Sequence, residues 1–233
     1  MRLETWSQLP NKMRTKEVRK YYNILIKHSG WFKFKRVMDI FVASIMLFVL
    51  ALPMVIIAIF IKWDSKGSVF FKQKRVTQYG RIFEIYKFRT MVENAASIGS
   101  QVTVNNDVRI TKVGKILRRF RMDEFPQVFN IIKGDMTLVG TRPEVIKYVK
   151  CYTPQMYATL LLPAGLTSRT SIAYKDEEKL LSNAANADMV YIHDILPVKM
   201  KYNLESLKQF GFKEDCSILW ATFLSVLKRD TKT

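Results

Sequence analysis

The chain has 233 residues and carries 38 Lys and Arg against 20 Asp and Glu, a formal net charge of +18 at pH 7. This length supports one hydrophobic core with an appended segment, and this charge predicts attraction to nucleic acid, an anionic lipid surface or phosphorylated small molecules. Two histidines are too few for a zinc site, and Cys151 and Cys216 lack metal-ligand spacing, as expected of reduced thiols in the cytosol.

The N-terminal extension, residues 1–34, contains a basic amphipathic pattern. Val18, Tyr21 or Tyr22, and Leu25 recur at helical spacing among lysines and arginines. Gly30 is a plausible end for this helix. Two interpretations fit equally well: a helix on a membrane surface, or a helix packed against the rest of the chain.

The longest apolar run extends from Ile40 to Ile61, with Ser44 as its only polar side chain and no charge. As a straight helix this run would be ~33 Å long, about the thickness of the hydrocarbon core of a bilayer. It begins too far into the chain, and is too long, for the apolar core of a signal peptide. A membrane segment is therefore expected over residues 35–62.

Proline and flanking charge indicate how this segment meets the membrane. Pro53 lies near the middle of the run, where a proline removes a helical hydrogen bond. Lysines and arginines flank both ends, which favours the cytoplasmic side for both flanks. We therefore expect a re-entrant helix-break-helix that bends at Pro53; the alternative is a kinked single span with an outside N-terminus.

The remainder, residues 63–233, is expected to form a cytosolic domain associated with the membrane. Residues 69–71 and 82–86 resemble short strands, and the turn residues 78–80 between them predict a β-hairpin. Lys87 and Arg89 follow the second strand on one face, either as a solvated surface or as a phosphate clamp. The segment 93–108 is small and polar and is expected to be a loop.

Two further amphipathic helices are expected, over residues 109–121 and near the C-terminus. In residues 109–121 the basic residues fill the helix around the stripe Val113, Ile116, Leu117 and Phe120, and Leu219, Trp220, Phe223, Leu224 and Leu227 dominate the C-terminal helix. Each helix fits either a membrane interface or a core-facing position, and the interface is favoured. The pattern disfavours nucleic acid as a partner, because nucleic-acid sites interleave aromatic residues with basic ones.

An acid pair, Asp123 and Glu124, follows three arginines and precedes Pro126. Pro126 fits the first turn of a helix that ends at Gly134, so the acids lie at a helix N-terminus. The simpler interpretation is an N-cap. The surrounding Arg118, Arg119, Arg121 and Arg142 favour the alternative, a site for an anionic substrate. Adjacent residues point in different directions, which favours separate roles for the two acids.

Several motifs occur together in order: "KRVMDIF", the proline-broken apolar run, "VFFKQKRV" with "YKFRTM", "VGKILRRFRMDEFPQVFNIIKGDMTLVGTRPE" and "DMVYI". This ordered set resembles the bacterial sugar transferases, the monotopic polyprenyl-phosphate phosphoglycosyl transferases that begin lipid-linked glycan synthesis. The resemblance covers residues 35 to about 228. It implies an enzyme of the bacterial inner membrane, on its cytoplasmic face, that moves a phosphosugar from a UDP-sugar to undecaprenyl phosphate and releases UMP in exopolysaccharide or capsule synthesis.

The resemblance also assigns roles to residues. Asp123 would be the nucleophile that forms an acyl phosphate, and Glu124 would bind Mg²⁺ at the diphosphate. Positions carried over as substrate-binding residues are Lys87, Arg89, Arg118, Arg142, Pro143 and Asp188. Asp188 would orient an arginine or help to hold the metal. The expected partners are a UDP-sugar, undecaprenyl phosphate and anionic membrane lipids.

The expected fold class is α+β and mainly helical: a membrane helix-break-helix, interfacial helices and a small β-hairpin. Three departures from the family pattern stand out: Leu52 before the central proline, Thr141 before Arg142, and "PAGLTSRTS" from Pro163. They leave the bend geometry and the sugar open, and the oligomeric state is open too, a homodimer included. Two alternatives remain: a non-catalytic basic membrane scaffold, and a transferase that moves the sugar alone and releases UDP.

Overall fold

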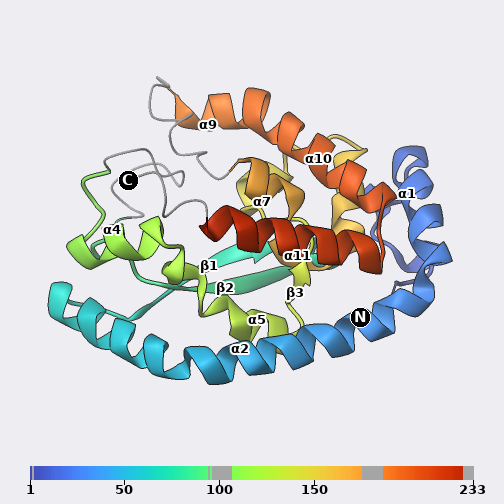
Figure 1. Ribbon diagram of the computed structural model, residues 1–233. Coiled ribbons are helices and arrows are strands. Elements are labelled where there is room, and N and C mark those ends of the chain that lie inside the picture. The colour runs from blue at the N-terminus through green and yellow to red at the C-terminus, as the bar shows by residue number, and fades with distance from the viewer. Residues whose placement is uncertain (2, 94, 96–106, 175–185, 228–233) are drawn as a thin grey trace.

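The computed structural model describes residues 1, 3–93, 95, 107–174 and 186–227. Helices dominate, and two small two-stranded sheets lie among them, which confirms the expected α+β class (Figure 1). The helices are α1 (Lys16–Lys27), α2 (Ser29–Asp64), α4 (Lys112–Arg119), α5 (Gln127–Lys133), α6 (Ile146–Val149), α7 (Arg169–Ala173), α9 (Ala187–Val190), α10 (Leu196–Lys208) and α11 (Phe212–Leu227). The short helical turns are η1 (Trp6–Gln8), η2 (Asn11–Met13), η3 (Gln78–Gly80), η4 (Met122–Glu124), η5 (Met156–Leu161) and the π-helical turn η6 (Tyr191–Ile195).

The expected β-hairpin is present. Strands β1 (Phe70–Val76) and β2 (Ile82–Phe88) pair antiparallel and are joined through η3, where Tyr79 and Gly80 both have positive φ. A second sheet pairs β3 (Met136–Val139) with β4 (Ala164–Thr167) in parallel. The loop expected over 93–108 lies largely outside the described residues.

The N-terminal helix α1 is packed against the rest of the chain. Its apolar residues Val18, Tyr21, Tyr22 and Leu25 are all buried, and α1 contacts η5 and α10. Figure 1 shows α1 beside the end of α10, close to the start of α2. This contact decides between the two interpretations of the α1 pattern, because the face that a membrane would need is already covered by protein.

The expected break at Pro53 is absent. Helix α2 runs without interruption from Ser29 to Asp64 with Pro53 inside it, and Figure 1 shows it as one curved helix along the edge of the molecule. The residues that face the domain, among them Phe32, Ala43, Met54 and Ile61, are buried along the whole length of the helix. We attribute its continuity to this packing, which offsets the cost of an interior proline, about 3 kcal/mol.

Both ends of α2 are attached to the same domain. Near its start, Lys35 forms a buried ion pair with Asp215 (2.6 Å), and Asp39 accepts hydrogen bonds from Thr137 Oγ1 (2.6 Å) and from the Leu138 N–H (3.1 Å). At its end, Asp64 accepts from the N–H of Val113 at 2.9 Å, which caps α4. Because both ends are attached, this helix, ~54 Å long, lies along the domain rather than projecting from it.

The outer face of α2 is apolar and exposed, as in Phe48, Leu52 and Trp63. Among the described residues, α2 is the single helix that is long and apolar enough to cross a membrane, by length and composition. The helices α4 and α11 each show two faces. Leu117 of α4 and Ile218 of α11 are buried, whereas Ile116, Phe120, Trp220 and Phe223 are exposed. Both interpretations therefore apply to these helices, because one side of each faces the core and the other side is available to an interface.

Candidate active site

The acid pair lies where the chain turns between α4 and α5. Arg121 adopts a left-handed conformation (φ 54°), and η4 follows immediately with Asp123 and Glu124. Pro126 is the N-cap of α5, one residue before the first turn in which the sequence places it, and Gly134 (φ 89°) is the C-cap, where the sequence predicts the end of the helix. The acids therefore enter a helix from a tight turn. No side-chain capping hydrogen bond is formed at this start, so the N-cap interpretation does not explain them.

Asn130 on α5 fixes this helix against the hairpin. Its side chain is fully buried, accepts from the Tyr86 N–H (3.0 Å) and donates to the Glu84 carbonyl (2.7 Å). Through these bonds Asn130 attaches α5 to the main chain of β2 next to Lys87. They therefore help to set the distance between Lys87 and the acids. Sequence reasoning missed Asn130, although a single amide within the apolar run 128–132 was the available signal.

Lys87 and Arg142 bring positive charge to the acid pair. The Lys87 ammonium lies 3.1 Å from Glu124 Oε1 and 3.9 Å from Asp123 Oδ2. The Arg142 guanidinium binds both carboxylate oxygens of Glu124, with Nη1 at 3.2 Å from Oε2 and Nη2 paired with Oε1. Both acid side chains are 13% exposed. Two adjacent acids thus converge on one lysine, rather than pointing apart as expected.

The two carboxyls nevertheless differ electrostatically. Burial raises the pKa of Asp123 above its ordinary value, and the nearby Lys87 and Arg118 offset only part of that rise. Burial acts on Glu124 in the same direction, but Arg142 and Lys87, with Arg121, hold the Glu124 pKa well below its ordinary value. Glu124 is therefore a fixed anion, while Asp123 is the less stabilised carboxylate and the better candidate for a nucleophile.

Arg89 does not join Lys87 in a clamp. Its guanidinium is buried and donates to the carbonyls of Ser65 and Lys66, both at 2.7 Å, just beyond the end of α2. The sequence pattern placed both cations on one face of a strand, but β2 ends at Phe88 and Arg89 lies beyond it. Arg89 thus caps the C-terminal end of α2.

Asp188 is bonded to residues other than the arginines of the acid site. Its two carboxylate oxygens accept from Lys147 Nζ and from the Tyr148 hydroxyl, each at 2.6 Å. The expected pairing of Asp188 with a site arginine is replaced by these two contacts. Pro143 follows Arg142 in an extended segment, and its carbonyl accepts from Arg75 at 3.0 Å.

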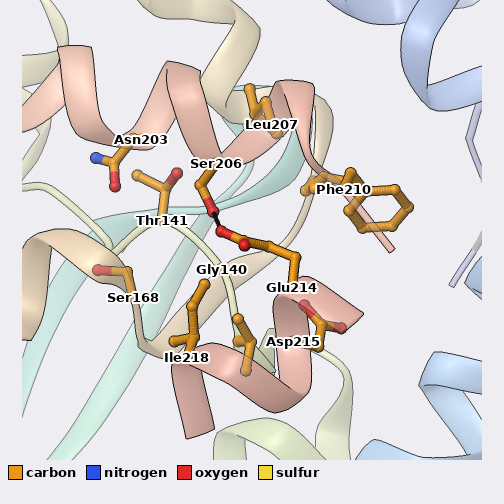
Figure 2. Close-up of a pocket in the computed structure, with 12 residues that line it drawn as sticks. Gly140, Thr141, Ser168, Asn203, Ser206, Leu207, Phe210, Glu214, Asp215 and Ile218 are labelled. Atoms are coloured by element: carbon orange, nitrogen blue, oxygen red, sulfur yellow. Dashed lines mark hydrogen bonds between the residues drawn. The ribbon is translucent and has the colours of Figure 1, made fainter. Parts of the chain in front are cut away.

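A small pocket lies between the end of β3 and the helices α10 and α11. Figure 2 shows that Gly140 and Thr141, which precede Arg142, line it together with Ser206 and Glu214. Ser206 donates to Glu214 at 2.9 Å. The pocket includes neither Asp123 nor Glu124, so it is not the acid site.

Few side chains in this site could hold a metal ion. In the described part of the chain, no group of three or more His, Cys, Asp or Glu side chains is placed to hold a metal ion. Mg²⁺ commonly takes only one or two carboxylates together with substrate phosphates. The pair Asp123 and Glu124 fits that smaller set, although Glu124 is bound to Arg142 and Lys87 in this structure.

Residues 31–229 match the family described as bacterial sugar transferase. The chain belongs to this family. A relative from Aeromonas hydrophila, named UDP-N-acetylgalactosamine-undecaprenyl-phosphate N-acetylgalactosaminephosphotransferase, is 35% identical over 83% of this chain and 43% of its own length. Undecaprenyl-phosphate galactose phosphotransferase from Salmonella typhimurium is 30% identical over 89% and 43%.

A Bacillus subtilis relative, named putative undecaprenyl-phosphate N-acetylgalactosaminyl 1-phosphate transferase, is 41% identical over 51% of this chain and 66% of its own length. The chain spans less than half the length of the Aeromonas and Salmonella relatives. The part of this bacterial sugar transferase that matches the family includes the acid pair, Lys87 and Arg142. It does not include α1, although the apolar residues of α1 are buried in the core.

Proposed function

We propose that this bacterial sugar transferase moves a phosphosugar from a UDP-sugar to undecaprenyl phosphate through a covalent intermediate on Asp123. The observation that carries the proposal is an acid pair held among cations: Asp123 and Glu124 converge on Lys87, and Arg142 binds Glu124. The names of the relatives, which act on undecaprenyl phosphate, support the acceptor.

The proposed chemistry has two displacements at one phosphorus. An Asp123 carboxylate oxygen attacks the sugar-bearing phosphorus, the bond to the bridging oxygen breaks, and UMP leaves with that oxygen. An oxygen of undecaprenyl phosphate then attacks the same phosphorus and releases the Asp123 carboxylate. The product is a diphosphate-linked sugar on the lipid. Dividing the transfer in two means that donor and acceptor need not be bound together.

The cations lower the electrostatic barrier to this attack. A carboxylate approaching a diphosphate is repelled unless positive charge is already in place. Lys87 lies within 3.9 Å of the Asp123 carboxylate and would neutralise the attacked phosphate, with Arg118 close enough to influence the Asp123 pKa. Arg142 would bind the leaving UMP or the second phosphate, in exchange for its present contact with Glu124.

Mg²⁺ is part of the proposal. Glu124, with Asp123 beside it, would hold the ion together with diphosphate oxygens, and the ion would supply further neutralisation of phosphate charge. The chain's own contribution is to keep Glu124 ionised, which the low pKa of Glu124 supports.

We also propose that α2 lies at the cytoplasmic face of the bacterial inner membrane, with both flanks on that side. Support comes from its attachment to one domain at both ends and from its exposed apolar outer face. Anionic lipids would bind the basic flanks. This geometry retains the expected topology without a break at Pro53, and it holds the acid pair near the depth of a polyprenyl phosphate headgroup.

Product analysis tests the proposed reaction. Purified protein in detergent is incubated with radiolabelled UDP-sugars, undecaprenyl phosphate and Mg²⁺, and the nucleotide product is separated. The proposal predicts UMP. Release of UDP would instead show transfer of the sugar alone, and absence of turnover with every UDP-sugar would support a scaffold.

A further inference from the structure

The segment that carries Arg142 has no regular secondary structure, yet both of its ends are fixed. On one side, the Thr141 carbonyl accepts from the Gly165 N–H at 2.8 Å. On the other side, the Glu144 carbonyl accepts from the Val76 N–H at 3.0 Å. An arginine in an extended segment depends on such contacts, because no helix or strand holds its backbone.

The Glu144 side chain provides a second attachment, which we call the Glu144 clamp and define as Glu144, Tyr191 and Lys199. The Tyr191 hydroxyl donates to Glu144 Oε1 at 2.7 Å and accepts from Lys199 Nζ at 2.7 Å. Lys199 Nζ also lies 3.2 Å from Glu144 Oε1. The clamp joins the Arg142 segment to η6 and α10, which supply Tyr191 and Lys199.

Burial shows that the clamp acts indirectly. All three residues are at most 6% exposed, so they do not reach a substrate in the acid site. Burial alone would raise the pKa of Glu144, but Lys199, Arg75 and the Tyr191 hydroxyl hold it below its ordinary value. Buried charges are tolerated only when fully partnered, and this network meets that condition at the point two residues beyond Arg142.

Asp188 lies at the far end of the same network. The rings of Tyr191 and Tyr148 pack with centroids 4.3 Å apart, and the Tyr148 hydroxyl donates to Asp188. The π-helical turn η6, which carries Tyr191, is an uncommon local structure that is often associated with function. Side chains from the Arg142 segment, α6, α9, η6 and α10 therefore meet in one network.

We propose that Glu144, Tyr191 and Lys199 are positioning residues that set the location of Arg142 and, through it, of Glu124. The inference rests on the proposed function, because Arg142 is assigned there to the phosphates of the nucleotide. A displaced Arg142 binds the diphosphate less well and supports departure of UMP less well. The clamp thus contributes to transfer without touching substrate.

The test removes one hydroxyl. In Tyr191→Phe the packing on Tyr148 is kept, while the hydrogen bonds to Glu144 and Lys199 are lost. We expect kcat/KM for UMP release to fall roughly 10-fold, the range of one hydrogen bond to a charged group. The matched control is Tyr21→Phe, which removes a buried hydroxyl bonded to Gln155 (2.9 Å) and is expected to keep wild-type kinetics.

A double-mutant cycle with Arg142→Lys separates positioning from general destabilisation. If the clamp acts through Arg142, Tyr191→Phe adds little in the Arg142→Lys background. Wild-type kinetics for Tyr191→Phe, or fully additive losses in the double variant, would overturn the proposal. Failure of the proposed function is distinct, since the wild-type protein itself would then release no UMP.

Discussion

At the scale of single residues, Lys87 and Arg89 have different roles despite their positions two apart. Lys87 contacts both acids, whereas Arg89 donates to the carbonyls beyond α2. Sequence alone could not separate them, because both are cations in one short motif. Only the end of β2 at Phe88 decides which of them faces the site.

This difference predicts opposite phenotypes for two matched variants. Lys87→Met should lower kcat/KM by ~100-fold, as for loss of a group that stabilises transition-state charge, and leave thermal stability nearly unchanged. Arg89→Met should lower the free energy of unfolding by about 2 kcal/mol, because the carbonyls of Ser65 and Lys66 lose a buried, charged donor. Kinetics and thermal unfolding in detergent measure both. Equal loss of activity without loss of stability in both variants would contradict these roles.

The pKa of Asp123 predicts the acid limb of the pH–rate profile. Burial raises this pKa, so the carboxylate needed for attack is lost at a higher pH than for an ordinary aspartate as the solution is acidified. Arg118 lowers the same pKa by its charge. Arg118→Gln should therefore move the acid limb to higher pH, whereas the exposed neighbour variant Arg119→Gln should not. An acid limb that stays in place in Arg118→Gln would argue against titration of Asp123.

At the scale of elements, the sequence predicts the hairpin and α5 well because their signals are local. Turn residues fix the hairpin, and Pro126 and Gly134 bound the helix. The parallel pair β3 and β4 is missed, because each strand is only four residues long and its partner lies far along the chain. The continuity of α2 through Pro53 is missed for a related reason, since it depends on packing against the whole domain.

Asn130 tests how α5 is placed. Asn130→Leu keeps the side-chain volume but leaves the Tyr86 N–H and the Glu84 carbonyl unpaired. We expect a loss of roughly 2–5 kcal/mol in the free energy of unfolding, because two main-chain groups lose a fully buried hydrogen-bond partner. The control is Asn23→Leu on the exposed face of α1, which should be nearly neutral. A neutral Asn130→Leu, measured by chemical denaturation in detergent, would show that α5 is held by apolar packing alone.

At the scale of the whole molecule, attachment of α2 at both ends predicts the membrane topology. Single cysteines at Asn23 and Lys201 are introduced after Cys151 and Cys216, both exposed and free, are replaced by serine. Neither new thiol should react with a membrane-impermeant maleimide added to intact cells, and both should react after lysis. Labelling of the residue 23 thiol in intact cells would show that α2 crosses the membrane.

The central claim is that the Asp123 carboxylate bonds transiently to phosphorus, and the adduct itself is the most direct measurement. Purified protein is incubated with a UDP-sugar and no lipid acceptor, and intact-protein and peptide mass spectrometry then locate any added phosphosugar. We predict one phosphosugar on Asp123 of the wild-type chain, with an equivalent of UMP released, and no adduct on Asp123→Asn. Undiminished turnover by Asp123→Asn with undecaprenyl phosphate present would contradict the account.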